Sequence, residues 1–587
     1  MTIVSNSQHL GKFFHDIRVG RGVTLKAASG DWSSATLSRF ERGEQDISTD
    51  KAVELMVRLG IEFSDFFLFY EAQPANFPMA ILNYSLSYHN QLISKRKAAY
   101  FAAHPTANAI TEYAGVLFDV AERWQSSDYH LSSAQEQCLA DRLAVPEQFD
   151  MIESEALKLV CGVASHEFLC LMKHRLERLD SQWHNRDMRL LSIWLGALMT
   201  HDLALADPLQ VYLQPLFTQG ETEMLITQYN SNWQFGVAAS AWLHEPTPQH
   251  ADAVEAIIAD QLMMNNRDDG NWFKNMFARM QFGQVRHNPE LVDHPQLLQV
   301  SHHAGEVVKQ RRHCMGVSVE DLVDTVSPTT LRRFEAGQTQ LAFSVMVDLM
   351  GVLGFMPSQV LNNLNRTPNH PNGVLGLAAT YLKISKLDSK AAQAEITRFT
   401  LVDLQKPEQI LGIQLFVLHC AAKIADQRLA AEAQVVFKQL LNINTWYRLE
   451  LLALNSVVKW LTVTQLGLLF DHAHRLLDQQ PALMGIISYL YDAASQAIVQ
   501  VVKHAPAEIA KDFVQQLRWL IQKDTETPGA WLATGSWLLA MAVLVPADPT
   551  RDAVAQYFKR SQRAGHLEAI AELKRTWRGI ADPALLK

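Results

Sequence analysis

The stretch Trp32-Ser-Ser-Ala-Thr-Leu-Ser-Arg-Phe-Glu-Arg-Gly-Glu-Gln45 recurs 294 positions later as Val326-Ser-Pro-Thr-Thr-Leu-Arg-Arg-Phe-Glu-Ala-Gly-Gln-Thr339. The two copies share a leucine, an arginine, a phenylalanine, a glutamate and a glycine at the same places. The same ungapped offset also pairs Gly11 with Gly305 and continues to Gly60. A register of this length indicates a duplicated domain. We therefore expect one chain to contain the two halves that other proteins obtain by dimerising.

Each copy has the sequence signals of short helices around a tight turn. In the first copy Thr24, and then Ser33 or Ser34, are placed to cap helices, and Gly43 stands where a helix ends in a left-handed residue. In the second copy Ser327 precedes a proline, which suits the first position of a helix. The expected helices of the first copy span residues 10–19, 25–29 and 35–42. This spacing predicts a helix-turn-helix, whose third helix enters the DNA major groove with its N-terminal half.

The side chains on that half of the third helix decide what is read. Arginine can pair with guanine, and alanine or the threonine methyl can touch thymine, whereas Leu37, Phe40, Leu331 and Phe334 are spaced to face a core. The candidate DNA-contacting residues are Thr24, Lys26, Ser33, Ser34, Ala35, Thr36, Ser38 and Arg39 in the first copy, and Thr329, Thr330, Arg332 and Arg333 in the second.

Composition limits the class of protein. The chain has 587 residues, 48% of them hydrophobic, and a formal net charge of −9, so DNA contacts must come from local basic patches. The five cysteines are scattered without a CxxC pair, which argues against disulfides or zinc. No signal peptide, membrane span, phosphate loop or nucleophile elbow is present. We expect a cytoplasmic protein with no cofactor, no membrane partner and no enzymatic activity.

Helical spacing dominates the rest of the chain, and turn signals fall about every twenty residues, as in a solenoid of antiparallel helix pairs. The expected fold is all-α. Its expected domains are a helix-turn-helix over 1–70, a TPR-like repeat domain over 71–298, a second helix-turn-helix over 299–366 that is degenerate in part, and a second TPR-like domain over 367–587. A weak echo of Pro146-Glu-Gln at Pro407-Glu-Gln predicts about thirty extra residues in the first copy.

Residues 22–48, Gly-Val-Thr-Leu-Lys-Ala-Ala-Ser-Gly-Asp-Trp-Ser-Ser-Ala-Thr-Leu-Ser-Arg-Phe-Glu-Arg-Gly-Glu-Gln-Asp-Ile-Ser, closely resemble the N-terminal domain of the Rgg/GadR/MutR transcriptional regulators. These are peptide-responsive regulators with a phage-repressor-type helix-turn-helix and TPR-like repeats. The resemblance implies a double-stranded DNA operator, a short signalling peptide as ligand, and buried ion pairs between Arg18 and Glu41 and between Arg312 and Glu335. Family members usually carry one such domain and form homodimers, whereas this chain carries two.

The resemblance also implies a peptide site on the repeats, where arginine and asparagine side chains suit an extended backbone. A tryptophan at a helix start is more often packing, and exposed arginines are more often solvated. The candidate residues are Trp183, Arg186 and Arg189 in the first repeat domain and Trp446, Arg448 and Asn455 in the second.

Two further possibilities stay open. Glu320-Asp321 replaces Lys26-Ala27 in the second copy, and residues 305–362 carry five Lys/Arg against six acids, which weakens the attraction to phosphates. The alternative function is therefore a protein-interaction scaffold or peptide-regulated inhibitor with vestigial helix-turn-helix domains. The other possibility keeps DNA binding but makes self-association the switch.

Overall fold

The computed structural model describes residues 6–62, 65–66, 90–124, 126, 128–143, 151–178, 186–218, 229–263, 267–294, 304–354, 377–402, 407–423, 428–444, 446–479, 487–522, 528–563 and 566–586. Within these ranges every extended element is a helix, and only isolated bridges have strand-like pairing. The fold is all-helical, as the sequence predicts. No helix in the described ranges has the length and apolar character needed to cross a membrane.

Residues 6–66 contain four helices, and we call them the first small unit. Thr24 and Ser33 cap the second and third of these helices by accepting bonds from the backbone N–H groups of Ala27 and Thr36. The first and third helices approach so closely that a β-carbon at Gly11 would lie 2.1 Å from the Phe40 carbonyl oxygen. The helices are α1 (Asn6–Gly20), α2 (Leu25–Ser29), α3 (Ser34–Glu41) and α4 (Thr49–Leu59).

The second small unit, residues 304–354, repeats this order with one change. Ser327 caps the third element and Pro328 is its first residue, as expected from the sequence. In place of α2 stands a single 3₁₀ turn, closed by reciprocal bonds between Ser318 and Asp321. Its elements are α18 (Ala304–Cys314), η2 (Glu320–Leu322), α19 (Pro328–Glu335) and α20 (Phe343–Leu353).

Two arrays of helices follow the small units, each built of successive antiparallel pairs. The first array, residues 90–294, contains α7 (Asn90–Ala103), α8 (Ala109–Arg123), α9 (Ser133–Arg142), α10 (Met151–Val160), η1 (Cys161–Val163), α11 (His166–Glu177), α12 (Arg186–Met199), α13 (Leu203–Thr218), α15 (Asn230–His244), α16 (Pro248–Met263) and α17 (Arg267–Met280).

The second array, residues 377–586, contains α22 (Leu377–Ser385), α23 (Ser389–Val402), α24 (Glu408–Ala421), α25 (Arg428–Asn442), α26 (Arg448–Val457), η3 (Val458–Trp460), α27 (Val463–Gln479), α28 (Ser488–His504), α29 (Ala507–Gln516), α30 (Arg518–Ile521), α31 (Pro528–Leu544), α32 (Asp548–Arg563), α33 (Leu567–Thr576) and η5 (Pro583–Leu586). The apolar helix α31 packs on α28.

Helix order corrects one expectation about the arrays. Helices α8 and α24 begin 299 residues apart, α10 and α26 begin 297 apart, and α16 and α32 begin 300 apart. A 3₁₀ turn also follows at the same place in each array: η1 comes directly after α10, which begins at residue 151, and η3 comes directly after α26, which begins at residue 448. The expectation of thirty extra residues in the first copy is therefore wrong. The three-residue match of Pro146 with Pro407 was too short to fix a register, and α24 corresponds to α8.

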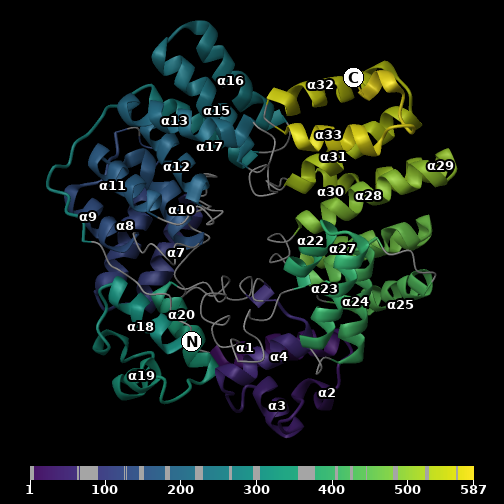
Figure 1. Cartoon of the computed structure of the whole chain (residues 1–587), viewed down its shortest axis with the longest axis horizontal. Helices are drawn as coiled ribbons and strands as arrows, with labels where there is room; N and C mark the ends of the chain where they lie inside the picture. Colours follow the sequence, from purple (N-terminus) through teal and green to yellow (C-terminus); the bar gives the residue numbers. More distant parts are fainter. Residues whose placement is uncertain are drawn as a thin grey trace.

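The first small unit packs against the second array, and the second small unit packs against the first array. Figure 1 shows α18 and α20 beside α7 and α8, and α1 and α4 beside the second array. At these contacts Arg21 pairs with Glu450 of α26, and Arg311 pairs with Glu153 of α10. At their far ends the arrays meet where α32 contacts α16. The four parts are therefore connected in a closed ring (Figure 1).

The small units also contact each other through a reciprocal backbone pairing. The N–H of Thr49 donates to the Leu341 carbonyl at 3.2 Å, and the N–H of Phe343 donates to the Ile47 carbonyl at 2.8 Å. Positions 47 and 341 differ by 294, as do 49 and 343, so each bond is the counterpart of the other. Ser48 faces its own counterpart, Ala342, in the antiparallel bridge between them. Isologous contacts in two-fold dimers have the same reciprocal pattern.

Candidate nucleic-acid interface

The N-terminal half of α3 presents a polar surface to solvent. Ser33, Ala35 and Arg39 are exposed, while Ser34, Thr36 and Ser38 are half-buried. Hydroxyl groups organise this end: Ser33 Oγ lies 2.9 Å from Thr36 Oγ1, and Ser34 Oγ lies 3.3 Å from Ser29 Oγ. Thr24 and Lys26 of the preceding helix are exposed as well. The opposite face is apolar and fully buried through Leu37 and Phe40.

The corresponding surface of α19 differs in its charge contacts. Thr329, Arg332 and Arg333 are exposed, and Thr330 shares a hydrogen bond with the capping Ser327. The guanidinium of Arg332 forms an ion pair with Glu320 of η2. Glu320 therefore engages Arg332, one of the arginines that the sequence places toward DNA. In the first unit the position that corresponds to Glu320 is Lys26.

Both small units contain a buried arginine–glutamate pair between their first and third helices. Arg18 meets the Glu41 carboxylate with two bonds, of 2.6 and 2.7 Å, and also donates to the Val23 carbonyl. Arg312 meets Glu335 in the same way at 2.8 and 2.9 Å. Two parallel bonds fix the orientation of both groups, so these pairs set how the third helix lies on the first.

Ion pairs engage several of the basic side chains of the first unit. Arg18 and Arg21 are buried in ion pairs. Lys12 pairs with Asp16, and Arg42 pairs with Glu44, whose pKa is lowered by the hydrogen bond from Arg42. The exposed cations without an ion pair on the described part of this surface are Lys26 and Arg39.

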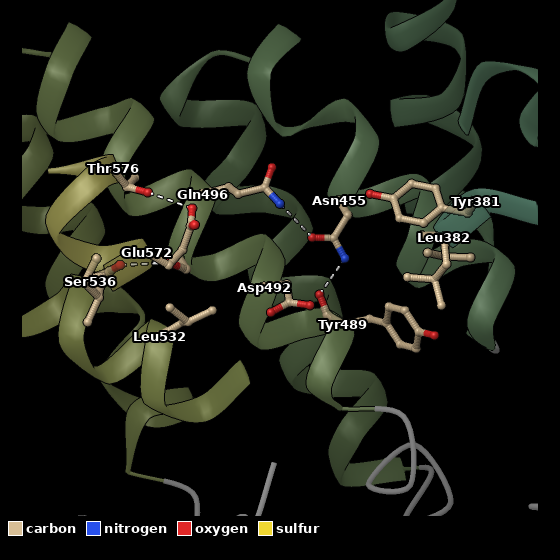
Figure 2. Close-up of a pocket in the computed structure, with 13 residues that line it drawn as sticks. Tyr381, Leu382, Asn455, Tyr489, Asp492, Gln496, Leu532, Ser536, Glu572 and Thr576 are labelled. Carbon is tan, nitrogen blue, oxygen red and sulfur yellow. Dashed lines mark hydrogen bonds between the residues drawn. The ribbon is translucent and has the colours of Figure 1, made fainter. Parts of the chain in front are cut away.

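A pocket of about 330 Å³ lies in the second array (Figure 2). It is formed by residues of α22, α26, α28, α31 and α33. The carboxylate of Asp492 points into it, beside Asn455 and Tyr489 in the view of Figure 2. The pocket is lined by Tyr381, Leu382, Leu452, Asn455, Tyr489, Asp492, Ser495, Gln496, Leu532, Ser536, Glu572, Leu573 and Thr576.

The structure gives packing roles to several residues that the sequence suggested for peptide binding. Trp446 is 1% exposed and donates its indole N–H to the Leu440 carbonyl, and Arg189 is 2% exposed and bonds Ser154. Neither is available to a ligand, because both fill gaps between helices.

Two of the other candidates, Arg186 and Arg448, are also engaged by neighbouring side chains. Arg186 pairs with Asp187 and donates to Tyr212. Arg448 pairs with Glu62 at the contact with the first small unit. Trp183 lies outside the described residues.

Asn455 does line the pocket, but its amide is already engaged. Its Nδ2 donates to the carbonyls of Leu451 and Tyr489, and its Oδ1 accepts from Gln496 (Figure 2). It therefore shapes the wall rather than offering free donors. Asp492 is not among the residues that the sequence suggested. Its sequence signal is a carboxylate in a stretch with no other charged side chain between Ser488 and Val502.

Comparisons with known proteins give limited information. No family model and no curated protein matches the chain. Two solved structures of the SHP pheromone receptor Rgg2 of Streptococcus dysgalactiae align at 12% identity over 47% of this chain and 98–100% of theirs, with TM-scores of 0.35 and 0.36. A protein of Listeria monocytogenes EGD-e described as a candidate transcriptional regulator aligns at 12% identity over 49% of this chain and 94% of its own, with a TM-score of 0.35. Because these scores lie below 0.5, the function is argued from the chain's own geometry.

Proposed function

We propose that this chain is a sequence-specific DNA-binding transcriptional regulator of the Rgg type, formed by tandem duplication so that one polypeptide carries both halves of a dimer. Its small units are helix-turn-helix domains that dock in adjacent major grooves of one operator. Its arrays are TPR-like repeats that bind a peptide or another small ligand.

The observation that carries this proposal is the reciprocal bridge at Ser48 and Ala342. It relates the two small units as a two-fold dimer would, and α3 and α19 lie at the same edge of the molecule, away from the far ends of the arrays (Figure 1). Two-fold dimers of this class read half-sites about one helical turn, roughly 34 Å, apart. The polar exposed faces of α3 and α19 differ, so the proposed operator is asymmetric.

The first unit is proposed to supply most of the affinity. Lys26 and Arg39 are exposed without ion pairs on its surface, whereas Glu320 neutralises Arg332 on the second unit. Each phosphate contact adds to affinity through counterion release, so an arginine already paired with a carboxylate contributes less.

The proposal is tested with duplexes that the wild-type protein selects from random sequence. Arg39→Ala is expected to weaken binding to the selected site by about 1–3 kcal/mol in a mobility shift at fixed salt. Lys390→Ala removes one positive charge from an exposed position on α23 and is the matched control. Equal affinity of Arg39→Ala and wild type would refute the assignment of α3 as the reading helix.

A second candidate function is a protein-interaction scaffold with vestigial helix-turn-helix domains. The observations that favour it are the net charge of −9 and the ion pair between Arg332 and Glu320. It predicts stable complexes with protein partners and no salt-dependent affinity for DNA, including the DNA upstream of its own gene. A salt titration of DNA binding therefore separates the two candidates.

A further inference from the structure

The pocket of the second array contains a carboxylate without a counterion. Asp492 is mostly buried, and within the described part of the chain its carboxylate has no hydrogen-bond or ion-pair partner. Burial alone raises the pKa of Asp492, to about 6, and no neighbouring cation opposes that shift. A buried acid without a partner costs free energy, so its retention inside a pocket points to a partner that comes from outside.

The rest of the lining selects the kind of partner. Among the described residues that line the pocket there is no lysine or arginine, so an anionic ligand would find no counter-charge among them. The second acid, Glu572, is already engaged by Arg575 and by the hydroxyl of Thr576. Asp492 is therefore the free anchor, and its charge is close enough to Tyr381 to raise the pKa of that phenol further, beyond the larger effect of burial.

We propose that this pocket binds an organic ammonium group, with the Asp492 carboxylate accepting its N–H bonds and the Leu382, Leu452 and Leu532 side chains covering the attached hydrocarbon. An ammonium ion has three donors and no acceptor, which matches an acceptor-only carboxylate. A pocket of about 330 Å³ is at the small end of the range for ligand sites. It accommodates a small amine or the first residue of a peptide rather than a long chain.

The pocket is connected to the first small unit through two helices. Helix α26 carries Leu452 and Asn455 of the lining, and also Glu450, which holds Arg21. On α28, the Tyr489 ring lies 5.6 Å from the guanidinium of Arg448, whose backbone N–H donates to Asp65. A ligand that shifts α26 against α28 therefore acts on the unit with the more exposed basic surface. This consequence, unlike the binding itself, rests on the proposed function.

Calorimetry on the full chain without DNA tests the binding. The probes are 2-phenylethylammonium chloride against 2-phenylethanol, and the tripeptide amide Leu-Leu-Leu-NH₂ against its N-acetyl form. The charged member of at least one pair is expected to bind, and its neutral counterpart is expected to bind at least about tenfold more weakly. If only 2-phenylethylammonium binds, the ligand of the pocket is assigned as a free amine. If only the tripeptide amide binds, the ligand is assigned as a peptide N-terminus.

A single isosteric change identifies the anchor. Asp492→Asn is expected to lower the affinity for the amine by about tenfold to a hundredfold, because the change removes a charged hydrogen bond and hardly alters the side-chain volume. Asp471→Asn on α27, whose carboxylate bonds Gln516 away from the pocket, is the matched control and should bind like wild type. A melting curve of each variant without ligand verifies that it is folded.

Equal binding of charged and neutral probes, no binding of any probe, or unchanged affinity in Asp492→Asn would overturn the inference. DNA binding is measured in a separate experiment, by a mobility shift with and without the amine. If the amine binds through Asp492 but wild type shows no affinity for DNA, the proposed function fails and the ammonium site stands.

Discussion

Arg21 of the first small unit and Glu450 of the second array form a bidentate ion pair with bonds of 2.7 and 2.8 Å, and both side chains are 1% exposed. Arg21 also donates to the Leu59 carbonyl. In the other half Arg311 pairs with Glu153 through one nitrogen and donates to the carbonyls of Leu353 and Gly354, and Leu353 is the counterpart of Leu59. Burial acts to lower the pKa of Arg21, but the charge and hydrogen bonds of Glu450, together with the charges of Asp65 and Tyr447, outweigh it and raise the pKa above its usual value. The two halves of the chain are thus joined crosswise.

Arg21→Met is expected to destabilise this junction by about 3–5 kcal/mol, because it leaves the Glu450 carboxylate buried without a counterion. A chain of several domains does not unfold in two states, so hydrogen exchange of α1, α4 and α26 is the suitable measurement. Protection from hydrogen exchange should be lost in the first small unit and the second array, and it should be unchanged in α18 and α10. Arg42→Met, which breaks the exposed pair with Glu44, is the control and should leave exchange unchanged. Protection lost equally at α10 would contradict the crosswise arrangement.

Glu320→Lys is expected to strengthen DNA binding by the second small unit. The change frees Arg332 and adds a cation, so one or two further phosphate contacts become available. Each contact steepens the slope of log K against log salt by about 0.9. The slope is measured by fluorescence anisotropy with the selected duplex. Glu432→Lys makes the same charge reversal at an exposed position on α25 and should leave the slope unaltered. If the two variants behave alike, α19 is not at the DNA.

Local sequence patterns predicted the small units well, because their determinants are close in sequence. The caps at Thr24, Ser33 and Ser327 act on N–H groups three residues away. The pair of Arg18 with Glu41 was expected from the family resemblance rather than from the pattern, and it forms in both copies. Of the three expected helices, the one over 25–29 has the predicted bounds, the one over 10–19 begins earlier, at Asn6, and the one over 35–42 is shifted by one residue, to Ser34–Glu41.

Contacts between residues that are far apart in the sequence could not be predicted from local patterns. Arg21 and Glu450 are 429 residues apart, and nothing in the local sequence of either distinguishes a buried ion pair from a solvated side chain. Trp446 and Asn455 were expected at a ligand because their side chains suit a peptide, yet neighbouring carbonyls use their donors first. Predicting the free carboxylate of Asp492 requires knowing which helices surround it.

The contact between the first small unit and the second array should weaken as pH rises toward neutrality. Asp65 is fully buried at this contact, and burial, with the charge of Glu62 adding to it, raises its pKa from 3.8 to about 7. The folded state therefore holds a proton that the unfolded chain loses near pH 4. Stability falls with rising pH between about 4 and 7 and then levels.

Asp65→Asn is expected to flatten this pH dependence, since amide nitrogen and oxygen do not titrate. The variant should melt at a higher temperature than wild type at pH 8 and show no such advantage at pH 5. Scanning calorimetry at pH 5, 6, 7 and 8 measures the effect, with Asp471→Asn as the control at a site that has a hydrogen-bond partner. A wild-type melting temperature that rises from pH 5 to pH 7 while the variant's stays constant would show that Asp65 is ionised in this range.

The far ends of the arrays meet through opposite charges at equivalent positions. Asp260 and Arg560 are each the thirteenth residue of their helices, α16 and α32, and lie 4.0 Å apart. Arg563 completes the contact: its Nη2 donates to Asp260 Oδ1 at 2.8 Å, and its Nε forms an ion pair at 2.8 Å with Oδ2 of this carboxylate, which is 2% exposed. In a homodimer the same position would bring two identical charges together. Within this single chain the position holds an acid on one helix and a base on the other.

Asp260→Arg is therefore expected to separate α16 from α32, because three cations then face one another at a buried contact. The ring would open at this end and remain closed at Ser48 and Ala342, which small-angle scattering detects as a larger radius of gyration at the same molecular mass. Adding Arg563→Asp restores one attractive pair and should return the radius most of the way toward wild type. If the single variant scatters like wild type, the contact is not what closes the ring. A rise in mass instead of radius would mean that the freed ends pair with a second copy.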